Sequence, residues 1–242
     1  MAVGEVGADR VCAVIASAEE TSRAASVLEA VRGQTLRPRD QVVVPRRGGL
    51  AALRADSPWL WLLDGSVLPE PPALERLLQV LDDPGPLPAP VLLASKIVTP
   101  AGAFDRSSLP VAQVMDRDVA IAAFERRVVS LRLVRGGSLL VNREWVSVPG
   151  HPSLDPFADD LEWAARILWR GPGMLVPGSV AVRLPVDARA AHRRARRQLV
   201  ERAKLLRTDA IDPTDKPWFA LTVLEDGLEH LRSAPARRGR GT

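Results

Sequence analysis

The sequence is poor in the residue types that build disulfide and zinc sites. Its 242 residues include one cysteine, Cys12, which lies in an apolar run and is expected to be a small core residue. A single cysteine excludes an intrachain disulfide framework and a cysteine-based zinc site. The three histidines, His151, His192 and His230, are scattered and have no spacing typical of a metal cluster.

Aromatic residues and long apolar runs are also scarce. Aromatic side chains make up 4% of the chain and tyrosine is absent, and platforms on which nucleic-acid bases could stack are not evident among the arginines of 189–207. No stretch approaches the roughly 18 apolar residues of a membrane-spanning helix, and Glu5 and Asp9 argue against a signal peptide. We therefore expect a cytoplasmic protein, with peripheral contact with the inner face of the membrane as an open alternative.

The residues that are abundant predict a globular protein with an uneven charge. Hydrophobic residues make up 46% and charged residues 26%, a balance that allows one large α/β domain or two small ones. The net charge is +4, and basic residues crowd into 189–207 and 237–240. Such crowding is typical either of a solvated helix face and a basic tail, or of a surface that attracts the phosphates of a nucleotide, nucleic acid or anionic lipid.

The stretch 59–70 is the most informative one in the chain. Residues 59–63 are all apolar and predict a buried strand, which runs directly into Asp64 and Gly65. Ligands of open α/β sheets bind outside the carboxyl ends of the strands, so Asp64 is a candidate site residue. Asp-Gly is also a common turn pair, and the stretch alone leaves both interpretations open.

The remaining elements alternate between strands and helices. Apolar runs predict further buried strands at 11–15, 41–44 and 91–94, a glycine-led strand at 135–141, and a strand pair at 174–182. Helical spacing predicts helices at about 21–33, 50–55, 71–81 and 159–169, and a loop with a helix is expected within 103–130. This succession favours an α/β fold with right-handed crossovers and a mostly parallel sheet flanked by helices.

The carboxyl-terminal part is predicted to be helical. A basic helix is expected at about 187–207 and a last helix at 218–231. We therefore divide the chain into a main domain of residues 1–185, a helical extension of residues 186–232, and a disordered basic tail of residues 233–242.

Four segments in order resemble the family 2 glycosyltransferases with the GT-A fold, which is Rossmann-like. Residues 11–35 resemble the family's opening strand, nucleotide loop and helix, and residues 59–78 the strand with the Asp-x-Asp motif and the helix behind it. Residues 135–150 are similar to its glycine-led acceptor-side segment, and residues 157–182 to its acidic helix start and Val-Pro strand. The resemblance covers roughly residues 10–185 and implies a GT-A-like main domain.

The resemblance also implies a reaction and roles for residues. A sugar would pass from a nucleotide-sugar donor to a hydroxyl acceptor, with inversion; the acceptor would be a glycan, a lipid-linked molecule or a small molecule. Asp160 would be the general base, although acids at a helix start are also favoured by the helix dipole alone. The resemblance assigns donor binding to Ser17, Glu19, Asp64, Ser66 and Arg183, and the acceptor or sugar side to Gly136, Gly137 and Asp159.

The chain departs from the family at the expected metal site. The Asp-x-Asp motif is Asp64-Gly65-Ser66, Pro45 replaces an Asp that often ends the second strand, and Arg183 stands where a metal-ligating His is often found. Asp64 is then the single carboxylate for Mg²⁺ or Mn²⁺, which prefer several hard oxygen ligands. A guanidinium cannot bind a metal but pairs directly with phosphate.

These departures leave several hypotheses open. The site either binds a donor without metal, through Arg183 and the arginines of 193–197, or has lost turnover. In the latter case the chain would be a catalytically weak GT-A-like domain that acts as a binding or scaffold protein. A third hypothesis is a basic module that binds anionic membrane or nucleic acid through 189–207, and nucleic acid is the less favoured partner because no aromatic residue lies among those arginines.

Overall fold

A computed structural model describes most of the chain, and within it the chain divides into two compact units, Met1–Pro185 and Val186–Thr242. The described residues are 7–17, 21–47, 56–82, 87–105, 108, 111–112, 123, 127–148, 150–185, 188–211, 213, 216–217, 219–221 and 223–224. For residues 21–22, 111–112, 188–195 and 198 the description covers the backbone alone.

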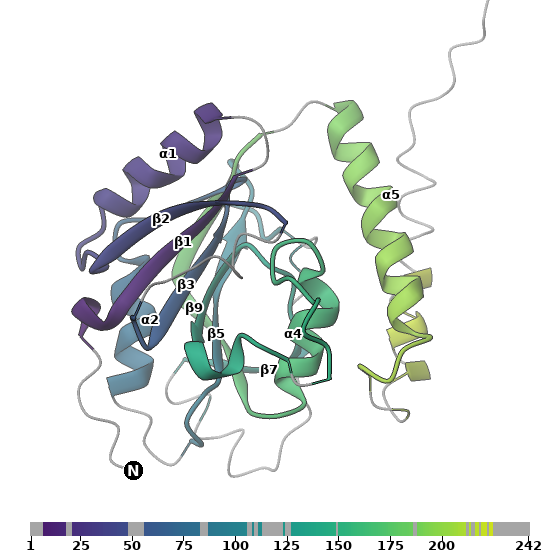
Figure 1. Cartoon of the computed structure of the whole chain (residues 1–242). Coiled ribbons are helices and arrows are strands. Elements are labelled where there is room, and N and C mark those ends of the chain that lie inside the picture. Colours follow the sequence, from purple (N-terminus) through teal and green to yellow (C-terminus); the bar gives the residue numbers. More distant parts are fainter. Residues whose placement is uncertain are drawn as a thin grey trace, which may run out of the picture. The chain divides into compact units, whose positions relative to one another are not determined.

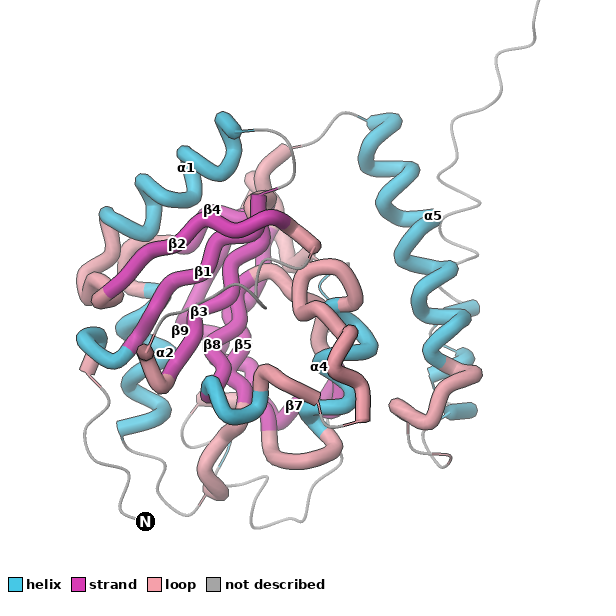
Figure 2. Tube along the Cα trace, viewed as in Figure 1, coloured by secondary structure: helices cyan, strands magenta, loops and turns pink. Residues whose placement is uncertain are grey.

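The first unit is built on one mixed sheet (Figures 1 and 2). In the described residues the sheet has nine strands, in the order β2-β1-β3-β8-β5-β9-β7-β6, with β4 paired to β9. Their bounds are β1 Val11–Ser17, β2 Asp40–Pro45, β3 Trp59–Asp64, β4 Val67–Pro69, β5 Leu92–Val98, β6 Val111–Ala112, β7 Val129–Leu133, β8 Ser138–Asn142 and β9 Gly173–Arg183.

Most of the long strands run in one direction. β1 is parallel to β2 and β3, β8 is antiparallel to β3 and β5, and β5 is parallel to β9. It follows that β1, β2, β3, β5 and β9 all point the same way, whereas β8, β7 and β4 run against them. The predicted α/β class with a mostly parallel, GT-A-like sheet is confirmed. Parallel strands end at one edge of a sheet, so this topology gathers the residues that follow them.

Helices cover both faces of the sheet (Figure 1). Side chains alternate along a strand, and in β1 Ile15 belongs to the same buried cluster as Val27 of α1 (Thr21–Arg32) and Leu74 of α2 (Ala73–Asp82). The neighbouring Val14 belongs to a second cluster with Trp163 of α4 (Asp160–Leu168). Burial on both faces explains why these strands are continuous apolar runs in the sequence. There are also two short 3₁₀ helices. η1 (Ala8–Arg10) directly precedes β1, and η3 (Arg143–Trp145) directly follows β8.

The predicted strand pair at 174–182 is wrong, because these residues form the single strand β9. Ser95 and Lys96 are consecutive residues of β5, but their partners in β9 are Val176 and Val180. The three residues between those partners therefore form a bulge. Proline lacks an N–H to donate to the ladder, so Pro177 is accommodated in the bulge without ending the strand.

The sequence did not predict the strands β4, β6 and β7. β4 and β6 have three and two residues, too few to show a period. Within 103–130, Ala123 is helical as expected of that segment, but β6 and the start of β7 lie there too. The helix predicted at 50–55 falls outside the described residues.

The second unit begins with the basic helix. α5 spans Ala188–Leu205, close to the predicted 187–207. The described positions at 216–217, 219–221 and 223–224 are helical, and residues 233–242 fall outside the description. Among the described residues, no helix has both the length and the apolar character needed to cross a bilayer.

Candidate functional site

The carboxyl ends of the parallel strands bring most of the predicted site residues to one edge of the sheet. Ser17 is the last residue of β1, Asp64 the last of β3, and Arg183 the last of β9. β8 is antiparallel and begins at this edge, so Gly136 and Gly137 lie there immediately before it. Residues remote in sequence thus meet because of strand direction.

Asp64 is both a turn-former and a residue of this edge. Its Oδ1 accepts a hydrogen bond from the Ser66 backbone N–H at 3.0 Å, which fixes an Asx-turn. The Gly65 N–H donates to the Ala16 carbonyl at 3.0 Å, and a Cβ on Gly65 would lie 2.6 Å from that oxygen. Only glycine permits this close approach. The turn interpretation of the Asp-Gly pair is confirmed, and the role of Asp64 as a site residue stays a prediction.

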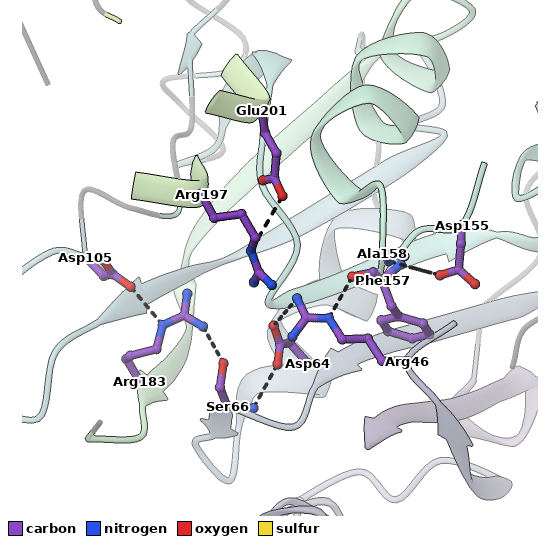
Figure 3. A network of polar contacts seen from close by, with 10 residues as sticks. All are labelled: Arg46, Asp64, Ser66, Asp105, Asp155, Phe157, Ala158, Arg183, Arg197 and Glu201. Carbon is purple, nitrogen blue, oxygen red and sulfur yellow. Dashed lines mark hydrogen bonds and ion pairs between the residues drawn. The ribbon is translucent and has the colours of Figure 1, made fainter. Parts of the chain in front are cut away.

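Arg46, which the sequence analysis did not select, contacts Asp64 from the end of β2 (Figure 3). Its Nη2 lies 3.8 Å from Asp64 Oδ2, in a pair whose side chains are 34% and 15% exposed. Its Nε donates a hydrogen bond to the Phe157 carbonyl at 3.1 Å. Arg46 therefore links Asp64 to the segment that leads into α4.

Arg183 is held between two residues at the end of β9. Its Nε donates to Asp105 Oδ2 at 2.9 Å, and its Nη1 donates to Ser66 Oγ at 2.8 Å. The residue is 8% exposed, so the ion pair with Asp105 compensates a buried positive charge. The predicted neighbours Ser66 and Arg183 are thus in direct contact, and Asp105 is a further residue that the sequence analysis missed.

The glycine pair joins the two acids of the site. The Asp64 N–H donates to the Gly137 carbonyl at 2.9 Å. A Cβ built on the preceding Gly136 would lie 3.2 Å from the Asp160 Cβ. Asp160 opens α4 and is 9% exposed. The backbone at 136–137 therefore spaces Asp64 and Asp160 at this edge of the sheet.

Asp159 has a different environment from its neighbour. It is exposed, it makes no side-chain cap to α4, and its Oδ2 accepts from the Asp155 N–H at 3.2 Å. It lines a cavity of about 630 Å³, whose other walls are Arg47, Val146, Ser147, Pro152, Ser153, Leu154, Asp155, Pro156 and Ala158. The two consecutive acids are thus divided between a buried position beside Gly136 and an open cavity.

The structure gives less support for the other residues that were predicted to bind the donor. Ser17 is partly buried, and its carbonyl accepts from the Arg46 N–H at 3.2 Å. Glu19 lies outside the described residues. The arginines of 193–197 belong to α5 in the second unit, where Arg197 pairs with Glu201 at 3.6 Å. Donor binding by these residues stays a prediction.

Arg46 could have been found from strand order, whereas Asp105 could not. Arg46 follows the second predicted strand directly, so a parallel neighbour of β1 must deliver it to the same edge as Asp64. Asp105 gave no comparable signal, because it lies beyond β5 after a loop closed by the Thr99 N–H to Ala103 carbonyl bond.

The residues present do not fit a divalent cation. Asp64 is engaged with the Ser66 N–H and faces Arg46, and the Ser66 hydroxyl oxygen accepts from the Arg183 guanidinium. A dication would be repelled by guanidinium groups at both of the motif's oxygen-bearing residues. No group of three or more His, Cys, Asp or Glu side chains that could hold a metal ion occurs among the described residues.

Comparison with solved structures identifies the fold. A mannosyltransferase from Pyrobaculum calidifontis, in complex with GDP-Man and Mn²⁺, superposes with a TM-score of 0.56 at 18% identity, over 96% of this chain and 76% of that chain. TarS 1-349 from S. aureus, in complex with UDP-GlcNAc, gives 0.53 at 10% identity, over 90% and 72%. These neighbours are GT-A type glycosyltransferases, and the chain shares their fold.

The same comparison limits how much can be transferred. GalNAc-T7 with UDP, GalNAc and Mn²⁺ gives a TM-score of 0.52 at 13% identity, and 74% of this chain covers 43% of that chain. The chain likewise spans 43% of a longer TarS structure, at a TM-score of 0.52. No family model matches the sequence. No curated protein matches it either.

Proposed function

We propose that the first unit is a glycosyltransferase that moves a sugar from a nucleotide-sugar donor to a hydroxyl acceptor with inversion. The observation that carries the proposal is the connection from Asp64 through the 136–137 backbone to Asp160. The proposal assigns the donor side to Asp64 and the role of base to Asp160, and it is supported by their position at the carboxyl edge of the GT-A-like sheet, where ligands of such sheets bind. Membership of family 2 belongs to the same proposal.

In the proposed reaction Asp160 acts as general base. It takes the proton of the acceptor hydroxyl as that oxygen bonds to the anomeric carbon of the sugar. The bond between that carbon and the diphosphate oxygen breaks, and the nucleoside diphosphate leaves with the electron pair. Attack on the face opposite the leaving group inverts the anomeric centre. Negative charge grows on the diphosphate in this step and requires cationic groups around it.

Donor binding does not require a divalent cation in this proposal. The guanidinium of Arg183 contacts Ser66, the residue in the position of the motif's second carboxylate. A guanidinium pairs directly with phosphate oxygens through charge-assisted hydrogen bonds.

The acceptor side is assigned to Gly136, Gly137 and Asp159. The cavity that Asp159 lines has polar walls at Arg47, Ser147, Ser153 and Asp155, together with apolar ones. Its volume of about 630 Å³ lies within the range of small-molecule sites. It suits a hydroxylated acceptor, whether a glycan, a small molecule or the sugar of a lipid-linked molecule. The proposal also includes peripheral binding of the protein to the inner face of the membrane through α5.

A thermal shift series tests donor binding. UDP-, GDP- and dTDP-sugars are each added to the full chain in EDTA, and we expect one nucleotide class to raise the melting temperature. The alternative function is a catalytically weak GT-A-like scaffold, which is favoured by the engagement of Asp64 with Arg46. Absence of stabilisation by every nucleotide-sugar supports the scaffold. Stabilisation followed by sugar transfer, lost in Asp160→Asn, supports the transferase.

A further inference from the structure

Arg183 has one nitrogen for which the protein supplies no acceptor. Nε is bonded to Asp105 and Nη1 to Ser66, whereas Nη2 is buried and has no hydrogen-bond partner in the part of the chain that the structure describes. Leaving a buried charged donor without an acceptor is costly. An anionic oxygen at Nη2 would remove that cost.

Ser66 offers a second donor at the same place. Its Oγ accepts from Arg183 Nη1, and its backbone N–H is used by Asp64. The hydroxyl proton must point away from the guanidinium, and the described residues provide no acceptor for it. Ser66 is partly exposed, so the hydroxyl can donate to a ligand oxygen.

Arg46 supplies a third set of donors on the other side of the Asp64–Ser66 turn (Figure 3). Its Nε is bonded to the Phe157 carbonyl. Its Nη2 lies 3.8 Å from Asp64 Oδ2, beyond hydrogen-bond distance. The two terminal nitrogens therefore form no hydrogen bond within the described residues, and at 34% side-chain exposure they are accessible.

We propose that Arg46, Ser66 and Arg183 form a metal-independent site for the diphosphate group of the donor, and that Asp105 is the residue that positions Arg183. The proposal deepens the proposed function and rests on it for the identity of the donor. Two guanidinium groups on either side of one turn suit a ligand with two linked anionic groups. A diphosphate has this form, whereas a single phosphate would reach one side of the turn.

Asp105 has a defined part in this site. Removing one partner of a buried ion pair leaves an uncompensated charge and is strongly destabilising. Asp105 therefore compensates the charge of the Arg183 guanidinium and holds the group in place when no anion is bound. Because Asp105 accepts from Nε of Arg183, the Nη2 atom of the same guanidinium stays available to the ligand.

Calorimetric titration of the full chain with inorganic pyrophosphate, in EDTA, tests the proposal. We expect pyrophosphate to bind, and to bind more tightly than inorganic phosphate. Each charge-assisted hydrogen bond is worth about a tenfold change in affinity or more, so Arg183→Gln and Arg46→Gln should each weaken binding about tenfold. Ser66→Ala leaves the Arg183–Asp105 pair intact and should weaken it several-fold.

Asp105 is tested by a pair of variants. Asp105→Asn should weaken pyrophosphate binding, and Asp105→Glu should restore part of it. A lower melting temperature with unchanged pyrophosphate affinity in Asp105→Asn would overturn the positioning role, because only a structural contribution would then remain. The matched control is Arg32→Gln, which removes an arginine from an exposed ion pair with Glu29 and should leave the affinity unchanged.

Two results overturn the anion site. One is pyrophosphate binding that occurs only after Mg²⁺ or Mn²⁺ is added; the other is affinity that is equal in Ser66→Ala, Arg46→Gln, Arg183→Gln and wild type. Pyrophosphate binding with the expected variant pattern but without sugar transfer supports the anion site and contradicts the proposed function. Failure of the two proposals is therefore distinguishable.

Discussion

Gly136 and Asp160 are in contact across 24 positions of sequence. A Cβ on Gly136 would lie 3.2 Å from the Asp160 Cβ, 3.4 Å from its Oδ2 and 3.7 Å from the Pro156 carbonyl. A separation of 3.2 Å is tighter than ordinary packing, so a side chain there would require Asp160 to move. The glycine thus fixes where the candidate base lies, in addition to any approach of the sugar to the backbone.

Gly136→Ala should therefore reduce sugar transfer while changing stability little. A misplacement of a reacting group by about 1 Å can cost about a hundredfold in rate, and we expect a loss of between tenfold and a hundredfold in kcat. Donor affinity should be unchanged. The control is Gly178→Ala, whose Cβ would meet only the flexible Arg76 side chain at 3.8 Å. Equal rates in both variants would contradict the steric link to Asp160.

Asp159 and Asp160 provide a matched pair for assigning the base. Asp160→Asn should lower kcat by about 10²–10⁴-fold, the range for loss of a general base, with donor binding retained in a thermal shift. Asp159→Asn removes a neighbouring carboxylate that faces the cavity and should raise the acceptor KM with kcat largely kept. The reverse pattern would assign the base to Asp159.

Removal of divalent cations by a chelator distinguishes donor binding through arginine from donor binding through a metal ion. Because guanidinium groups lie at both Asp64 and Ser66, transfer or donor hydrolysis should proceed equally in EDTA and in added Mn²⁺. Rates are compared over a range of Mn²⁺ concentrations after exhaustive chelation. Strict dependence on Mn²⁺ would contradict donor binding through arginine.

The sequence was sufficient to predict the strands whose two faces are both buried in the fold. Residues 59–63 and 11–15 are continuous apolar runs because α1 and α2 cover one face of the sheet and α4 the other. The order of these runs and of the helices between them was enough to predict an α/β fold with a mostly parallel sheet, and the resemblance to family 2 glycosyltransferases implied its GT-A-like form. The strand pair at 174–182 was predicted wrongly because the sequence does not show that Pro177 lies in a bulge.

The site was less predictable because its contacts connect distant segments. The contact between Ser66 and Arg183 depends on β4 pairing antiparallel with β9, and β4 is too short to predict from periodicity. Asp105 reaches Arg183 from a segment with no regular pattern. The family resemblance suggested that Arg183 replaces a metal-ligating His, but it could not indicate which carboxylate holds the arginine.

The basic helix α5 should bind anionic vesicles in a salt-dependent way. Residues 188–205 contain seven arginines and lysines and one acid, and Arg196, Arg197 and Lys204 are exposed. Attraction of such residues to anionic headgroups falls with ionic strength. Cosedimentation with vesicles of phosphatidylglycerol and phosphatidylcholine should therefore weaken between low and high salt, and vanish with phosphatidylcholine alone.

A variant with Gln at Arg193, Arg194, Arg196 and Arg197 should lose this binding. The control replaces Arg10, Arg32, Arg37 and Arg39, which are exposed on the first unit, and changes the net charge by the same amount. Equal loss in both variants would mean that overall charge, and not α5, causes the attraction. Stronger binding to duplex DNA than to the vesicles would contradict a membrane surface as the partner.

Cys12 should make the protein less stable in alkali. Burial, with a smaller contribution from the Asp40 carboxylate, raises the pKa of the thiol from 9.0 to about 11. The unfolded chain releases the thiol proton near pH 9 and the folded chain keeps it. The unfolded state therefore binds fewer protons between pH 9 and 11, and the free energy of unfolding falls as pH rises through that window.

The expected loss is about 2–3 kcal/mol, since each pKa unit corresponds to about 1.4 kcal/mol. Chemical denaturation at pH 7, 9 and 10.5 measures it, with Cys12→Ala as the control. The variant starts from a lower stability because the residue is fully buried, but it should lack the part of the alkaline slope that the thiol causes. Tyrosine is absent and the three lysines are common to both proteins, so the difference in slope isolates the thiol. Parallel slopes would show that the thiol titrates alike in the folded and unfolded chain.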